Sequence, residues 1–260
     1  MHLADALGLG SSAVVALVGA GGKKTAMGQL TAEGTSDGDA VGYTTTTAMP
    51  PPPDLPIVLT GPDEWRSDLT AKEPPVAFAH ESVADPERVE RKVRGFEPEV
   101  VDRIADSGLF DWLLVKADGA RKREFKAPGS GEPVIPSTAT HVVPVASVAV
   151  VGETLTTDVV HRPERVAAIT ALDVGDTITA MAVGTVLTHP AGGLRNAPSE
   201  ATVIPLVNKA DTESRRQTAK AVLTDALSQT SRCSRGIVTS FEAGICEVVT
   251  ATPEREASND

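Results

Sequence analysis

Residues 14–25 read VVALVGAGGKKT, and this stretch decides the fold expected for the rest of the chain. Residues 14–18 are apolar and mostly β-branched, which is typical of a strand buried on both faces of a sheet. Gly19, Gly21 and Gly22 follow, and glycines allow positive φ angles and a close approach of backbone N–H groups to a phosphate. Residues 25–30 predict a helix, whose N-terminus would face the same anion. Strand, glycine loop, lysine and helix in this order indicate a phosphate-binding loop.

The loop is shorter than the standard pattern G-x-x-x-x-G-K-[ST], because Leu17 stands five residues before Gly22. It fits G-x-x-G-K, the form seen in Mur-type ligases, with Lys23 as the phosphate lysine. Lys24 then stands where Ser or Thr would hold Mg²⁺, so that Thr25 is the candidate for this role. Alternatively, Lys24 is the phosphate lysine in a shifted register. A glycine-rich turn without a ligand is the structural alternative.

Asp118 follows a second strongly apolar stretch, residues 112–116 with the sequence WLLVK. Phosphate-loop proteins place the acid that holds Mg²⁺ just past such a strand, directly or through water. Thr46, near the end of a predicted strand over residues 40–47, is a further candidate metal ligand. The alternatives are a common Asp-Gly turn and a threonine-rich strand end.

Basic residues gather after Asp118, at positions 121, 122, 123 and 126. Arg121 and Arg123 are the candidates for offsetting charge on a transferred phosphoryl group, because arginine suits bidentate contact with phosphate. A solvated loop is the usual explanation of such a run. Residues 127–136, which carry Glu132, are long for a passive connection and are typical of an active-site lid.

The motif N-K-x-D occurs late in the chain, as Asn208, Lys209 and Asp211, after the apolar stretch 202–207. In guanine-nucleotide proteins the aspartate of this motif accepts hydrogen bonds from guanine, and adenine has no matching donors. The position of the motif after a strand favours binding of a base, and the nucleotide is expected to be GTP or ATP. Alternatively, residues 211–213 only cap a helix predicted over residues 213–227.

Composition limits the classes of protein to consider. The chain has 260 residues and a formal net charge of −11, which argues against binding of nucleic acid or an anionic membrane surface. No stretch approaches the roughly 18 apolar residues of a membrane span, and the first ten residues lack the features of a signal peptide, so a cytoplasmic protein is expected. The two cysteines are not spaced for a metal site, and we expect them to be reduced.

The remaining patterns complete the expected order of strands and helices. Strands are expected at residues 57–60, 76–79, 141–145, 147–151 and 237–240, and helices at residues 63–71, 86–107 with a break at 95–98, 161–172 and 177–188. We expect one α/β domain over residues 1–252, with a mostly parallel, doubly wound sheet in three layers, and a disordered tail over residues 253–260.

Five segments occur in an order that resembles a known family: VGAGGKKT, YTTTTAM, VKADGARKREFKAPGSGEPVIP, HRPE and LVNKAD. The chain resembles the selenium-dependent hydroxylase accessory proteins of the YqeC type over most of residues 13–240. This resemblance implies a P-loop-like nucleotide-binding protein associated with the maturation of selenium-dependent molybdenum hydroxylases. Lys24 and Lys116 depart from the family, which tends to have Thr or Ser after the loop lysine and often Glu before the Asp motif.

These patterns lead to one hypothesis and two alternatives. The hypothesis is Mg²⁺-dependent hydrolysis of GTP or ATP, with phosphates held at residues 19–25, Mg²⁺ at Thr25, Thr46 and Asp118, and the base at residues 208–211. The expected partners are a purine nucleotide and a molybdenum hydroxylase or its cofactor. A chaperone that binds a nucleotide or cofactor without turnover is the first alternative. The second is a small-molecule ligase or kinase with a Mur-like loop.

Overall fold

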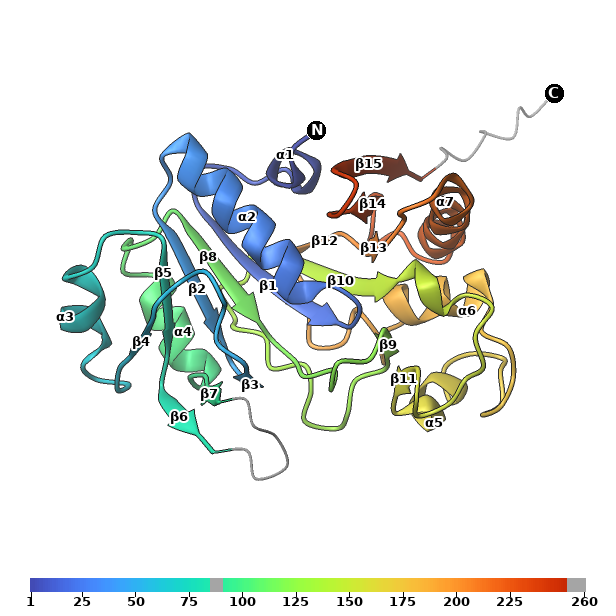
Figure 1. Cartoon of the computed structure of the whole chain (residues 1–260), viewed down its shortest axis with the longest axis horizontal. Coiled ribbons are helices and arrows are strands. Elements are labelled where there is room, and N and C mark those ends of the chain that lie inside the picture. The colour runs from blue at the N-terminus through green and yellow to red at the C-terminus, as the bar shows by residue number, and fades with distance from the viewer. Residues whose placement is uncertain (85–90, 252–260) are drawn as a thin grey trace.

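The computed structural model of the chain, which describes residues 1–84 and 91–251, has a central sheet with helices packed on both faces (Figure 1). The strands follow the spatial order β15-β14-β13-β10-β1-β8-β2-β5-β4, with β12 paired to β10. In chain order they are β1 Ala13–Gly19, β2 Val41–Thr45, β4 Ile57–Leu59, β5 Val76–Ala79, β8 Trp112–Lys116, β10 His141–Ser147, β12 Thr202–Val203, β13 Leu206–Asn208, β14 Arg235–Ser240 and β15 Ile245–Thr250. The α/β class and the mostly parallel sheet predicted from the sequence are confirmed.

Strand β1 lies between two parallel neighbours in the middle of this sheet. It pairs with β8 on one side and with β10 on the other, so that Leu17 lies opposite both Lys116 and Val143. The pairing of β14 with β15 is antiparallel, and every other pairing in this sheet is parallel. Because parallel strands end at the same edge, the loops after β1, β8 and β13 gather at one edge of the sheet.

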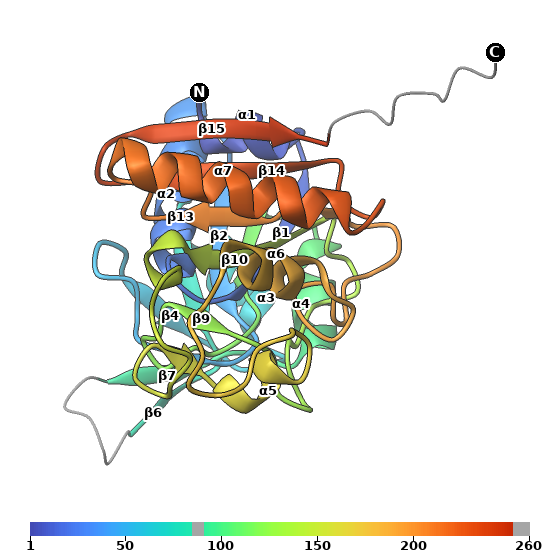
Figure 2. The same ribbon diagram turned by 90° about the vertical axis from the view of Figure 1, so that its right-hand side faces the viewer.

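Both faces of the sheet are covered by helices. These are α1 Leu3–Leu7, α2 Lys23–Asp37, α3 Trp65–Thr70, α4 Pro98–Ala105, α5 Pro163–Ala167, α6 Ala180–Thr188 and α7 Glu213–Ser228, with the 3₁₀ helix η1 Val148–Val150. On β1, Val15 and Leu17 pack in the core under α1 and α2, whereas Val14 and Ala16 pack in the core that includes α4. A further core lies between α6, α7 and the sheet (Figure 2). The alternation confirms that β1 is buried on both faces.

Two small sheets lie beyond the carboxyl ends of the parallel strands (Figure 1). One joins β3 Ala48–Met49, β7 Lys92–Arg94 and β6 Glu81–Val83 in antiparallel pairings. The other joins β9 Phe125–Lys126 and β11 Val160–His161 in parallel. Since β3 follows β2 and β9 follows β8, these sheets fix the backbone that surrounds the ends of the central strands.

The structure corrects four of the predicted elements. Residues 92–94 are a strand where helix was predicted, and the helix there begins only at Pro98. Residues 148–150 form a 3₁₀ helix because β10 continues to Ser147 without a break. The predicted strand 202–207 is divided between β12 and β13 at residues 204–205. The helix predicted over 161–172 is limited to α5, Pro163–Ala167.

Two further points concern the ends of the sheet and of the chain. The sequence predicted no strand after residues 237–240, but β15 pairs along the outer edge of β14. The predicted tail, residues 253–260, and residues 86–90 of the predicted helix lie outside the described residues. Among the residues that the structure describes, no helix is long and apolar enough to cross a membrane.

Candidate functional site

The loop between β1 and α2 contains three glycines whose backbone conformations other residues rarely adopt. Gly19, Gly21 and Gly22 have φ angles of 88°, 82° and 148°, which L side chains rarely adopt. A Cβ atom on Gly21 would come within 2.7 Å of the Glu124 carbonyl oxygen, and one on Gly22 would overlap the Asn208 amide. The loop is therefore packed closely between β9 and the end of β13.

Several N–H groups of this loop remain open. The N–H of Gly19 donates to Asp118 Oδ2 at 2.8 Å, and that of Ala20 donates to the Val145 carbonyl at 2.8 Å. Within the described ranges 1–84 and 91–251, the N–H groups of residues 21–25 donate to no protein acceptor. They lie at the N-terminus of α2, where an anion is favoured by unpaired donors and the helix dipole.

Asp118 lies directly beside this loop and is held by two lysines. Its Oδ1 atom is 2.8 Å from Lys23 Nζ, and its Oδ2 atom is 3.0 Å from Lys126 Nζ. The Lys23 ammonium also donates to the Gly19 carbonyl. All three side chains are at most 5% exposed, so the pairs are screened little by water.

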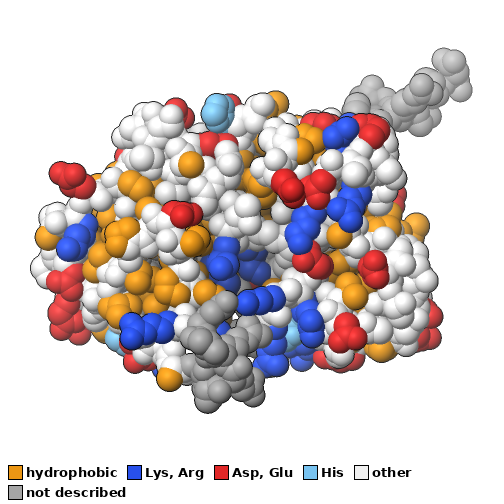
Figure 3. All heavy atoms as spheres, viewed as in Figure 1, with side chains coloured by type: hydrophobic (Ala, Val, Ile, Leu, Met, Phe, Trp, Pro, Cys, Tyr) orange, Lys and Arg blue, Asp and Glu red, His pale blue; other side chains and the backbone are white. Residues whose placement is uncertain are grey.

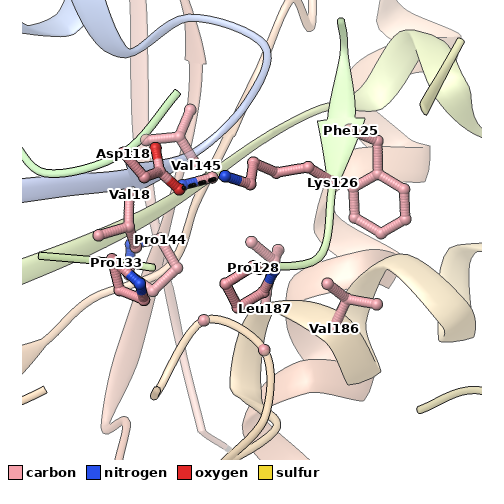
Figure 4. A pocket seen from close by; sticks show the side chains of 13 residues that line it. Val18, Asp118, Phe125, Lys126, Pro128, Pro133, Pro144, Val145, Val186 and Leu187 are labelled. Atoms are coloured by element: carbon pink, nitrogen blue, oxygen red, sulfur yellow. Dashed lines mark hydrogen bonds and ion pairs between the residues drawn. The ribbon is translucent and has the colours of Figure 1, made fainter. Parts of the chain in front are cut away.

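Lys126 links this acid to a second one. Its Nζ atom donates to Glu132 Oε2 at 2.8 Å and to the Gly119 carbonyl at 2.6 Å, and Glu132 Oε2 also accepts from Arg162 at 2.7 Å. In Figure 4, Lys126 reaches from β9 toward Asp118 along a small pocket lined mostly by proline and aliphatic side chains. Apolar walls of this kind strengthen the ion pairs, because they lower the local dielectric constant.

The pairings hold both acids ionised. Burial alone would raise the pKa of Asp118, but the Lys23 and Lys126 ammonium groups outweigh it and keep that pKa below its ordinary value. For Glu132, burial is likewise outweighed by the hydrogen bond and charge of Lys126 and by Arg162, which lowers the pKa to about 2. Both side chains are therefore carboxylates at neutral pH.

Lys116, at the end of β8, is a third buried lysine beside this cluster. Its Nζ atom donates to Thr47 Oγ1 at 3.0 Å and to the Ala48 carbonyl at 3.3 Å. No carboxylate of the described residues pairs with it. Burial, followed by the repulsion of Lys23, lowers the pKa of Lys116 to about 7.

The predicted Mg²⁺ ligands do not form a metal site in this conformation. Both oxygens of Asp118 face ammonium groups, and the Thr46 hydroxyl donates to the Val134 carbonyl at 2.6 Å. Thr25 is exposed on the first turn of α2, two residues beyond Lys23. No cluster of three Asp, Glu, His or Cys side chains suited to a metal occurs among the residues described. The donors present therefore do not fit a bound Mg²⁺.

The N-K-x-D segment is connected to the phosphate loop through Asn208. Its buried amide donates to the Gly21 carbonyl at 3.1 Å, and its Oδ1 atom accepts from the Thr239 hydroxyl at 3.0 Å. Lys209 pairs with Glu124 at 2.6 Å. Asp211 accepts from the Ser240 hydroxyl at 2.6 Å and pairs with Arg215 at 3.3 Å. The asparagine thus fixes the loop, and the aspartate lies half-exposed after β13.

Replacing Asn208 with alanine is expected to cost about 1–3 kcal/mol of unfolding free energy, because two buried hydrogen bonds lose their partner. Urea denaturation measures this loss, and hydrogen exchange should rise at Gly19 and Ala20, whose N–H groups are hydrogen-bonded. Asn196→Ala is the matched control, since that amide also donates to a carbonyl, Pro133 O at 2.9 Å, which is not part of residues 19–25. Equal exchange at the loop in both variants would show that Asn208 does not fix it.

Of the predicted residues, the structure brings together Gly19, Gly21, Gly22, Lys23, Asp118 and Asn208. Arg121 is exposed and Arg123 half-buried, and neither pairs with an acid in the part of the chain that the structure describes. The sequence interpretation placed no specific contacts on Lys126, Glu132 and Arg162. The sequence indicates Lys126 only as part of the basic run and Glu132 only as part of the candidate lid, and all three lie in the segments FKAP, GSGEP and HRPE, which also carry the family resemblance.

Basic side chains dominate the surface at this edge despite the negative net charge. Figure 3 shows lysine and arginine side chains around a hollow near the centre of the face seen in Figure 1. Lys24 and Arg121, which follow β1 and β8 in the chain, are both exposed. An edge with open N–H groups and excess lysine and arginine attracts anions.

Comparison with known proteins assigns the chain to a family. The model of the family described as YqeC protein matches residues 15–164. The chain is also 31% identical over 199 residues to the Uncharacterized protein YqeC of Escherichia coli (strain K12), covering 75% of each chain. The chain belongs to the YqeC family. The family match contains the loop, Asp118, Lys126, Glu132 and Arg162, whereas the N-K-x-D segment lies beyond it. No solved structure matches.

Proposed function

We propose that this member of the YqeC family binds a purine nucleoside triphosphate and acts as an accessory protein in the maturation of a selenium-dependent molybdenum hydroxylase. The open N–H groups of residues 21–25, beside Lys23, carry the nucleotide part of this proposal. They provide several donors and a positive charge for one polyphosphate. The client enzyme comes from the resemblance of the sequence motifs.

The position of the N-K-x-D segment supports a purine as the base. Asn208 ties this segment to the phosphate loop, so that Lys209 and Asp211 lie at the same edge of the sheet as the phosphates would. The Arg215 partner of Asp211 is itself partly exposed, at 46% of its side chain. A surface ion pair of this kind contributes little, and a base with two N–H donors would replace it at small cost.

Hydrolysis of the bound triphosphate is the activity expected from the sequence, and the position of Asp118 beside the loop supports it. It requires that the carboxylate be released from Lys23 and Lys126. Binding without turnover is the second candidate function. The observation that favours it is that both oxygens of Asp118 face ammonium groups, while Lys24 takes the position of the metal-binding hydroxyl.

Replacing Lys23 with alanine is expected to weaken GTP and ATP binding by about 10- to 100-fold, because the loop loses its one buried charge for phosphate. Calorimetry on the full chain measures the affinity for both nucleotides. Lys72→Ala is the matched control, since this exposed lysine follows α3 at the far end of the sheet (Figure 1). The control should bind as the wild type does.

The same preparation separates the two candidate functions. Release of inorganic phosphate that is lost in Lys23→Ala and Asp118→Asn supports hydrolysis. Nucleotide binding with no phosphate release, in the presence and absence of a molybdenum hydroxylase, supports binding without turnover. If neither nucleotide binds the wild-type chain, the proposal is wrong.

A further inference from the structure

Five charged side chains form one connected network at the phosphate loop, and its cations outnumber its acids. Lys23, Lys126 and Arg162 contribute three positive charges. Asp118 and Glu132 contribute two negative charges. Exposed Lys24 and Arg121 add positive charge at the rim. The network therefore has one net positive charge before any ligand binds.

The ammonium groups of Lys126 and Lys23 face the two oxygens of Asp118 that a metal held by this acid would bind. The Lys126 ammonium is 3.0 Å from Asp118 Oδ2 and 2.8 Å from Glu132 Oε2, so it bridges these two acids. A divalent cation approaching either acid would meet this charge and that of Lys23 on the other oxygen of Asp118. Like charges at such distances repel strongly in an apolar surrounding.

The side-chain hydroxyl groups near the loop do not offset this repulsion. The Thr46 hydroxyl donates to Val134, and that of Thr45 donates to the Lys116 carbonyl at 2.7 Å. Lys24 replaces the hydroxyl expected after the loop lysine, which adds one more positive charge. The oxygen ligands that Mg²⁺ prefers, the two acids of the network and these hydroxyl groups, are thus already paired, and the site contains the ammonium groups that a polyphosphate prefers.

We propose that Lys23, rather than a divalent cation, offsets the charge of the ligand's phosphates while Lys126 offsets that of Asp118 and Glu132, so that a polyphosphate binds this chain without Mg²⁺. This inference rests on the proposed nucleotide site and states how that site balances charge. On binding, the phosphate oxygens accept hydrogen bonds from the loop N–H groups and approach Lys23. Lys126 remains on Asp118 and Glu132 and keeps their negative charges from repelling the ligand.

The test compares binding in MgCl₂ with binding in EDTA. Inorganic tripolyphosphate, GTP and ATP are each titrated into the full chain by calorimetry. The affinity in EDTA is expected to equal or exceed that in MgCl₂, because magnesium complexes of the ligand carry less negative charge. A fall of about tenfold or more in EDTA overturns the inference, since each tenfold change is about 1.4 kcal/mol of binding free energy.

Lys126→Met tests the lysine itself. It keeps most of the length of the side chain and removes the charge, so the affinity in EDTA should fall by about tenfold or more, and MgCl₂ should then restore part of it. Lys220→Met is the matched control, because Lys220 pairs with Glu247 on β15 at 2.7 Å, outside the network. An unchanged affinity of folded Lys126→Met in EDTA also overturns the inference.

Glu132→Gln keeps the proposal testable if Lys126→Met does not fold. This change removes one negative charge from the network and leaves Lys126 on Asp118, so tripolyphosphate should bind more tightly in EDTA. Weaker binding in this folded variant contradicts the proposed charge balance. Binding of the wild type only in MgCl₂ overturns this inference alone, whereas no binding of any probe in either buffer also overturns the proposed function.

Discussion

Replacing Asp118 with asparagine is expected to lower the unfolding free energy by about 3–5 kcal/mol, because the change leaves two buried ammonium groups without their shared counter-ion. Lys23 would retain only the Gly19 carbonyl as a partner, and Lys126 would retain Glu132. Asparagine has nearly the same size as aspartate, so a cavity does not contribute to the loss. Urea denaturation at neutral pH measures it.

The matched control is Asp211→Asn, which removes a carboxylate of the same kind from a half-exposed position. Asp211 pairs with Arg215, whose side chain is partly exposed, and we expect a loss of about 1 kcal/mol or less. The double variant Asp118→Asn, Lys23→Met should recover part of the loss, since it also removes an unpaired charge. If Asp118→Asn is as stable as the control, the buried pairs contribute little to folding.

The loss should also depend on pH, with a sign that follows from the pKa of Asp118. Its pKa in the folded chain lies below the ordinary value, which for an aspartate is about 3.9 in an unfolded chain. The stabilisation is therefore complete above about pH 4 and decreases as the pH falls toward the folded pKa. The difference between wild type and Asp118→Asn should narrow in acid, and a difference that grows in acid contradicts this assignment.

The centre of the sheet could be predicted because its residues carry the signal locally. Strand β1 is a continuous apolar run, and the glycines after it mark a turn in which three residues have positive φ angles. Asp118 follows β8 in the same way. Since parallel strands end at one edge, the sequence alone implied that these two ends meet.

The partners of Asp118 could not be predicted in this way. Lys126 reaches it because β9 pairs with β11, a contact of two residues in each strand that no periodic pattern announces. Arg162 contacts Glu132 from a left-handed backbone position, with a φ angle of 65°, just before α5. A run of basic residues looks the same whether it is solvated or folded back onto a buried acid.

The errors in secondary structure have the same origin. Val93 and Phe96 fit the apolar side of a helix by their spacing, but residues 92–94 form a strand because β3 and β6 lie on either side of them. The edge strand β15 has five partly buried residues and one exposed residue, so its pattern is weak. The pairing with β14 makes residues 245–250 a strand. Pairing of this kind overrides the local preference of a segment whose own pattern is weak.

Gly19→Ala should be the most damaging single change in the loop, and Gly38→Ala separates its causes. The two glycines have nearly equal φ angles, 88° and 89°, so alanine suffers the same backbone strain of about 1–2 kcal/mol at both positions. A Cβ atom on Gly38 meets no atom within 4 Å, whereas one on Gly19 would overlap the Val145 carbonyl oxygen. The difference between the variants therefore isolates the overlap.

The overlap at Gly19 cannot be relieved by moving a side chain, because the atoms it involves belong to the Val145 backbone. Val145 lies opposite Gly19 in the parallel pairing of β10 with β1, and its carbonyl accepts from the Ala20 N–H at 2.8 Å. Either strand must move, which breaks that bond and shifts the Gly19 N–H away from Asp118. We expect Gly19→Ala to lose at least about 2 kcal/mol more than Gly38→Ala in urea denaturation.

Ligand binding gives the second measurement. In Gly38→Ala the loop is unchanged, so tripolyphosphate affinity should equal that of the wild type. In Gly19→Ala the N–H groups of residues 21–25 move with the strand end, and the affinity should fall by about tenfold or more even where the protein remains folded. Equal stability and equal affinity in the two variants would mean that the loop adapts freely to β10, and a phosphate would then not depend on a preformed arrangement of these donors.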